Sequence, residues 1–103
     1  MVGPYPDPAK GWNREWIRVM AEPMRQFQLK YNVPIYVGEF GVIRLAPGGA
    51  QWLDDWISVF EEYGWDWSFH AYREWSGWSV EHSDDKNLEQ PVSDTARKQV
   101  LLK

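Results

Sequence analysis

The feature that most constrains the fold is the run Val-Pro-Ile-Tyr-Val-Gly-Glu-Phe-Gly at residues 33–41. Its strand-forming residues do not alternate with polar ones, which is typical of a parallel strand covered on both faces. Glu39 follows near the carboxyl end between two glycines, where the backbone can bend and a ligand can approach closely. A carboxylate in that position is costly unless it is paired or has a chemical role. We therefore predict a buried strand over about 34–40, with Glu39 at the strand end where α/β barrels carry catalytic residues.

A second strand is expected one helix further along the chain. Residues 50–63 place apolar side chains on one helical face, and Gly64 fits the C-cap of that helix. The aromatic stretch 66–72 then predicts another strand. Two strands joined through a helix require a right-handed parallel crossover. The predicted fold class is therefore α/β, and because so small a sheet keeps two unpaired edges, we expect the unit to be part of something larger.

The segment before the first strand is predicted to be helical. Residues 1–12 are rich in Pro and Gly and predict an irregular N-terminal segment. Asn13 is a plausible N-cap, and the apolar residues that follow recur at helical spacing. Pro23 interrupts this stripe, so we expect a kink, or two helices that meet near Glu22.

The C-terminal part is predicted to consist of a long polar loop and a last helix. The loop covers 73–92, and the helix is expected to begin near Ser93 or Asp94. These segments predict one domain over 1–103. Its parts are the N-terminal segment at 1–12, the strand–helix–strand unit with its preceding kinked helix at 13–92, and the C-terminal helix at 93–103.

Charge and composition exclude several function classes. The net charge is -4 and no Lys/Arg cluster occurs, which argues against a nucleic-acid partner. No apolar run has the length of a membrane span, so no membrane partner is predicted. The chain has no cysteine and no cluster with metal-ligand spacing, so we predict neither a metal nor any other cofactor. The N-terminus shows no signal-peptide pattern, and the localisation stays open.

Tryptophan is the compositional outlier, because the chain has eight Trp residues. Large aromatic side chains dominate the packing of cores, which is the simpler explanation for any single one of them. The alternative is a sugar-binding cleft in which flat indole faces stack on pyranose rings. Position in the sequence singles out Trp75 and Trp78, which follow the second predicted strand.

The run that contains Glu39, together with His-Ala-Tyr-Arg-Glu-Trp-Ser-Gly-Trp-Ser at residues 70–79, resembles the C-terminal part of family 5 glycoside hydrolases. This is the retaining cellulase group built on an eight-stranded (β/α)8 TIM barrel. The resemblance covers most of this chain but only the last two strands of such a barrel, seven and eight. It implies a partial barrel that is completed by association.

The resemblance also implies roles for individual residues. Glu39 matches the nucleophile of the family, and Trp75 matches the aromatic platform on which a sugar stacks. Trp78, His70 and Glu74 lie in the same motif and are candidate substrate-binding residues. A retaining mechanism needs a second carboxyl group about 5–5.5 Å from the first. The family carries it in an Asn-Glu motif that does not occur here, so the chain is expected to hold half of the catalytic pair.

Simpler interpretations stand beside these roles. Glu39 could instead be a buried structural carboxylate that pairs with Arg44 or Arg73. His70 could be a hydrogen-bonded core residue or a cleft residue, and His82 is expected to be exposed.

Three carboxylates could replace the missing acid. Asp66 begins its strand and would lie at the far end from Glu39. Glu74 and Glu81 lie on the same end as Glu39, but as loop carboxylates they are more simply solvated charges or partners of Arg73.

The sequence thus predicts a retaining, endo-β-1,4-glucanase-like hydrolase, or a fragment of one, that acts on a β-linked polysaccharide or oligosaccharide. The alternative is a non-catalytic carbohydrate-binding or structural barrel fragment that lacks the acid/base. The expected macromolecular partner is a complementing barrel fragment or further copies of the chain. Four copies would supply the eight strands that close a barrel.

Overall fold

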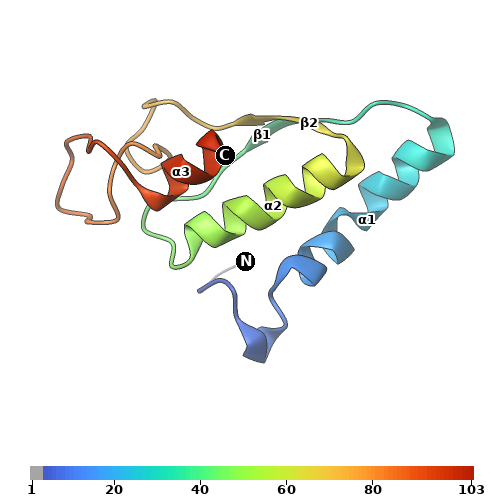
Figure 1. The fold of residues 1–103 in the computed structure, drawn as a ribbon, viewed down its shortest axis with the longest axis horizontal. Helices are drawn as coiled ribbons and strands as arrows, with labels where there is room; N and C mark the ends of the chain where they lie inside the picture. Colours follow the sequence, from blue (N-terminus) through green and yellow to red (C-terminus); the bar gives the residue numbers. More distant parts are fainter. Residues whose placement is uncertain (1–3) are drawn as a thin grey trace.

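The computed structural model describes residues 4–103; the first three residues of the predicted N-terminal segment lie outside this range. Its elements, in chain order, are η1 (Pro8–Lys10), α1 (Arg14–Tyr31), β1 (Tyr36–Phe40), α2 (Gly49–Tyr63), β2 (Asp66–Phe69) and α3 (Ala96–Leu102) (Figure 1). β1 and β2 form a parallel two-stranded sheet. The predicted mixture of helices with two parallel strands is therefore confirmed.

Both strands lie where they were predicted but are shorter. Tyr36 pairs with Asp66 at one end of the sheet and Phe40 with Phe69 at the other, with an irregularity between them. Backbone hydrogen bonding ends where the amide of His70 donates to the carbonyl of Phe40 at 2.8 Å. Gly41 lies so close to the carbonyl of His70 that a Cβ atom there would collide with it. The segments that follow β1 and β2 therefore leave the sheet side by side, and only glycine fits at position 41, where they touch.

The helices cover one face of this sheet. Figure 1 shows α2 between α1 and the strands, and α2 packs against α1, α3 and β2. Ile17 from α1 and Val59 and Phe60 from α2 meet Trp65 in the buried core. Among residues 4–103 no helix covers the other face, and Tyr36 in β1 is 63% exposed. The prediction that this strand is buried on both faces is therefore wrong for the chain by itself.

Helix α1 begins and ends as an α-helix with conventional caps. The Asn13 side chain accepts a hydrogen bond from the amide of Trp16 at 2.9 Å, which confirms the predicted N-cap. Pro23 lies inside one continuous helix, so the predicted division into two helices is not found. Proline removes the hydrogen bond to the carbonyl of Val19. Val19 is 69% exposed, so the missing hydrogen bond lies on the solvent side of α1.

A second face of α1 is apolar and exposed. Met20, Met24, Phe27 and Tyr31 follow one another at helical spacing, and each side chain is about half exposed. Phe27 and Tyr31 contact each other, with ring centroids 4.8 Å apart. We call these four residues the α1 stripe. Such a contiguous apolar surface is typical of a face that another molecule covers.

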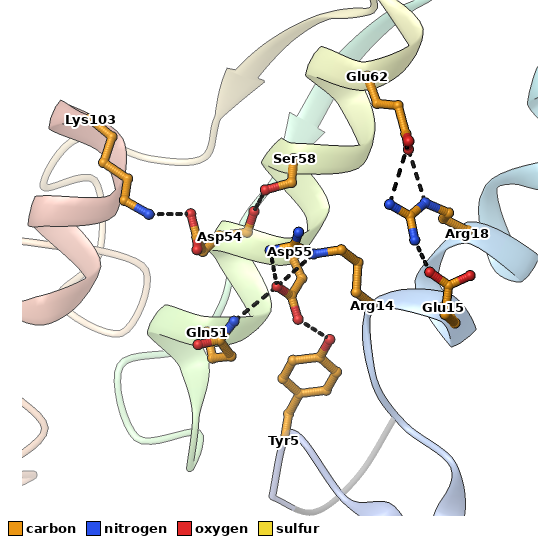
Figure 2. Close-up of polar contacts among 10 residues, drawn as sticks. All are labelled: Tyr5, Arg14, Glu15, Arg18, Gln51, Asp54, Asp55, Ser58, Glu62 and Lys103. Atoms are coloured by element: carbon orange, nitrogen blue, oxygen red, sulfur yellow. Dashed lines mark hydrogen bonds and ion pairs between the residues drawn. The ribbon is translucent and has the colours of Figure 1, made fainter.

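A polar network attaches the N-terminal segment and the start of α1 to α2 (Figure 2). Asp55 on α2 is 5% exposed, and its carboxylate accepts hydrogen bonds from three side chains. These are Tyr5 at 2.5 Å, Arg14 at 3.0 and 3.2 Å and Gln51 at 2.9 Å. Burial of the Tyr5 phenol and its hydrogen bond to Asp55 raise the pKa of Tyr5 well above its usual value. The N-terminal segment is thus ordered by this carboxylate, and it contains the short helix η1 rather than being irregular throughout.

The other ion pairs in Figure 2 lie on the surface. Arg18 pairs with Glu15 and, at 2.9 Å, with Glu62, while Lys103 pairs with Asp54 at 2.9 Å. Exposed pairs of this kind contribute little to stability because water and salt screen them.

Two buried arginines organise the loop between β2 and α3. Arg44 donates hydrogen bonds to the carbonyls of Ser83, Asp85 and Leu88, and Arg97 donates to those of Ser79 and His82. His82 lies inside this arrangement and is only 7% exposed, so the prediction that it is exposed is wrong.

The last helix begins later than predicted. The side chain of Thr95 accepts a hydrogen bond from the amide of Lys98, which makes Thr95 the N-cap instead of Ser93 or Asp94. Within residues 4–103, no helix combines the length and the apolar character that a membrane span needs.

Candidate active site

Three titratable side chains meet where the two strands end. Glu39 is the penultimate residue of β1, and its carboxylate is 73% exposed. His70 follows β2 directly, and its Nδ1 atom lies 3.9 Å from Oε1 of Glu39. On the other side of the ring, Nε2 of His70 lies 3.8 Å from Oε2 of Glu74. The imidazole therefore lies between two carboxylates at the carboxyl end of the sheet.

Two tryptophans adjoin this group. Trp78 contacts the His70 ring edge to face, with centroids 5.8 Å apart, and contacts Trp75 in the same manner at 5.7 Å. Trp75 is 53% exposed. Gly77 permits this pair, since a Cβ atom at that position would collide with the Trp75 ring. The structure thus brings together all five residues that the sequence singled out as candidates.

The simpler interpretation of Glu39 is not supported. Arg44 is held by the loop carbonyls and by Glu89 at 3.0 Å, and Arg73 is held by Glu81 at 2.9 Å. Neither arginine is therefore the partner of Glu39, and an exposed carboxylate is not a buried structural one. His70, with about 29% of its side chain exposed, lies among the site residues rather than in the core.

The remaining carboxylates have other surroundings. Asp66 pairs with Tyr36 at the opposite end of the sheet from Glu39, as predicted. Glu81 accepts hydrogen bonds from Arg73 at 2.9 Å and from Lys98 at 3.1 Å. The hydrogen bond from Lys98, followed by that from Arg73, lowers the pKa of Glu81. Glu81 therefore ties the segment that carries Glu74 to α3 and is not available as a catalytic acid.

The Glu81 pKa predicts a pH dependence of stability. Because the folded state lowers this pKa below its ordinary value of 4.5, the stabilisation is present above pH 4.5 and decreases as the pH falls through the folded value. We expect Glu81→Gln to reduce the loss of thermal stability between pH 5 and about pH 3, measured by circular dichroism. Glu89→Gln is the matched control, because Glu89 is an exposed loop carboxylate that forms an ion pair with Arg44. An unchanged acid profile in Glu81→Gln would contradict this role.

Several residues that shape the site gave little signal in the sequence. Arg44 and Arg97 resemble ordinary surface arginines until the fold buries them. Gly41 was the one detectable signal, as a glycine directly after the strand that carries Glu39. In the described part of the chain, no group of three or more His, Cys, Asp or Glu side chains is placed to hold a metal ion.

Both the sequence and the fold of this chain are similar to parts of known glucanases. The chain is 40% identical over 53 residues to endoglucanase C of Acetivibrio thermocellus and to endoglucanase C307 of Clostridium sp. (strain F1). This matching region is 50% of the chain but only 16% of each relative, so the chain spans a small part of their length. No family model matches the chain.

The fold is similar to that of a solved hyperthermophilic endo-β-1,4-glucanase, which was crystallised in complex with substrate. The TM-score is 0.69 at 23% identity, and the similarity covers 99% of this chain and 31% of the glucanase. The chain is therefore similar in sequence to part of an endoglucanase and shares the fold of part of a glucanase. The predicted resemblance to a fragment of a cellulase is therefore confirmed.

Proposed function

We propose that this chain is the C-terminal part of a retaining endo-β-1,4-glucanase of the family 5 kind, with residues 1–103 forming one partial (β/α)8 domain. The observation that carries the proposal is the exposed carboxylate of Glu39 at the carboxyl end of β1, next to His70 and to exposed Trp75 with half-buried Trp78 behind it. The sequence similarity to endoglucanases and the fold similarity to a glucanase support it.

In this proposal Glu39 is the nucleophile. Its ionised oxygen attacks the anomeric carbon, the bond from that carbon to the leaving oxygen breaks, and a second carboxyl group gives the leaving oxygen a proton. The second carboxylate then takes a proton from a water molecule, whose oxygen attacks the anomeric carbon of the glycosyl-enzyme ester; the sugar is released and the Glu39 carboxylate is restored. The exposure of Glu39 leaves its oxygens accessible to a sugar ring.

The tryptophan pair and the adjoining polar side chains would bind the substrate. The Trp75 ring is accessible to solvent and Trp78 supports it, so a pyranose can stack on this platform. His70 and Glu74 offer hydrogen-bonding groups beside the reacting carboxylate. A β-1,4-linked glucan suits such a flat aromatic surface.

We propose that the second carboxyl group comes from outside this chain. Glu74 lies across the His70 ring from Glu39. Glu81 is held by two cations, and Asp66 lies at the opposite end of the sheet. We propose that a complementing barrel fragment or further copies of the chain supply it. The unpaired edges of a two-stranded sheet and the exposed α1 stripe are the surfaces that such an association would cover.

A non-catalytic function is the second candidate. The exposed Trp75 would bind β-glucan chains even without a second carboxylate, and the chain would then act as a carbohydrate-binding or structural barrel fragment. The two candidates differ in their dependence on Glu39, because only hydrolysis requires a nucleophile.

The experiment that tests the proposal is hydrolysis of a soluble cellulose derivative by wild type and Glu39→Gln, with the native mass of each sample recorded. We expect hydrolysis in wild-type samples whose native mass exceeds that of one chain, and none in Glu39→Gln at the same mass. Hydrolysis that persists in Glu39→Gln would contradict the nucleophile. Sugar binding without hydrolysis in associated wild-type samples would favour the non-catalytic candidate.

The platform gives a separate prediction. Trp75→Ala should weaken cellotetraose binding by about fivefold, since loss of one exposed stacking surface costs about 1 kcal/mol. Isothermal titration calorimetry measures the change. Trp12→Ala is the control, because Trp12 packs against Trp16 away from the strand ends. Equal weakening in both variants would count against a specific platform.

A further inference from the structure

A half-open cavity adjoins the candidate active site and shares Trp78 with it. Its volume is about 270 Å³, and it lies between the loop after β1, the first turns of α2 and Trp78. The side chains that form it include Val42, Ile43, Ala46, Pro47, Trp52 and Trp78. None of its lining residues carries a charge, and the one lining hydroxyl, that of Tyr5, already donates to Asp55.

The chemistry of this lining selects an apolar occupant. The lining is more apolar than polar, so an apolar occupant would remove apolar surface from water, and the volume exceeds that of the apolar cavities of about 150 Å³ that bind benzene. Two indole rings on its wall favour an aromatic occupant, because aromatic rings gain from edge and offset contacts in addition to burial. A charged ligand would lose its hydration and find no partner of opposite charge.

The cavity is connected with the candidate active site through shared residues. Trp78 lines the cavity and also contacts His70 and Trp75. Gly41 lines it as well and lies against the carbonyl of His70. An occupant would therefore contact the residue that supports the tryptophan platform, while the exposed Trp75 remains outside the cavity lining.

We infer that this cavity is a binding site for an uncharged, single-ring aromatic molecule, distinct from the proposed sugar platform and sharing Trp78 with it. The inference stands on the cavity and its lining, and it does not require Glu39 to be a nucleophile. If the sugar platform is also correct, one chain binds both ligands, and Trp78 contributes to both sites.

The test is a titration of the full chain with toluene, followed through the indole N–H signals of Trp52 and Trp78 by NMR. We expect saturable shifts of these two signals. Ala46→Leu fills the cavity and should weaken binding at least about tenfold, because the added side chain occupies the volume of the ligand. Ala96→Leu, the same substitution at an exposed position on α3, should leave toluene binding unchanged.

Further variants keep the outcome decisive. Val42→Leu fills the cavity from another wall and replaces Ala46→Leu if that variant does not fold, as judged by circular dichroism. Trp75→Ala should retain toluene binding while its cellotetraose binding weakens, which separates this site from the proposed function. Wild type without saturable shifts, or shifts that persist in a folded cavity-filling variant, would overturn the inference whatever the sugar titration shows.

Discussion

Glu39→Gln should abolish covalent labelling of the chain by 2,4-dinitrophenyl 2-deoxy-2-fluoro-cellobioside. In this reagent dinitrophenolate departs without a proton, so the missing second carboxyl group is not needed for the first step. The fluorine slows the hydrolysis of the ester that Glu39 forms with the anomeric carbon, so the adduct accumulates. The amide that replaces this carboxylate in the variant is a far weaker nucleophile, and we expect labelling to slow by at least about a thousandfold. Mass spectrometry of the intact chain and of its peptides measures the adduct and its position.

A neighbouring carboxylate provides the control. Glu74→Gln removes an exposed carboxylate from the same group, on the other side of His70, and should still be labelled. Labelling of Glu74 in place of Glu39, or an unchanged rate in Glu39→Gln, would contradict the assignment of the nucleophile. The experiment therefore distinguishes two carboxylates that contact the same imidazole.

Asp55→Ala should destabilise the fold more than any other single change to a polar residue in Figure 2. The carboxylate is almost fully buried and binds Tyr5, Arg14 and Gln51 together. Its removal leaves the Tyr5 hydroxyl without an acceptor inside the protein and the Arg14 cation without its counter-charge. Leaving the buried Tyr5 hydroxyl unpaired costs about 1–3 kcal/mol, and the Arg14 side chain adds little because it is 44% exposed and water reaches it. We therefore expect a loss of about 1–3 kcal/mol in the free energy of unfolding.

Residue 54 offers a matched control in the same helix. Asp54 pairs with Lys103 on the surface, so Asp54→Ala should cost less than about 1 kcal/mol. Urea unfolding followed by tryptophan fluorescence compares the two variants with wild type. Equal destabilisation by both changes would show that the Asp55 network contributes no more than an exposed pair.

The strand–helix–strand unit could be predicted from local sequence because its signals are local. β-Branched and aromatic residues specify the strands, and an apolar helical face with Gly64 as its C-cap specifies α2. Pro23 left a kink and a division into two helices both open, because proline removes one hydrogen bond of a helix. The structure has one continuous helix over Arg14–Tyr31, and whether a helix continues past a proline is a property of the folded chain.

The candidate site was predictable to the extent that its residues follow the strand ends. Parallel strands place their carboxyl ends side by side, so Glu39 and the 70–79 motif had to approach each other. Which side chains then meet was not predictable. The position of His70 between Glu39 and Glu74 depends on how both chains leave the sheet at Gly41.

The sequence by itself determined the order and type of the main elements, the polarity of the sheet and the strand end at which a glucanase-like site would lie. Only the tertiary structure decided that Asp55 is buried with three partners, that His82 is enclosed, and that a cavity lies beside Trp78. The physical reason is the separation along the sequence of the residues that interact. Propensity, periodicity and capping act between near neighbours in the chain, whereas burial and pairing depend on residues that only folding brings together.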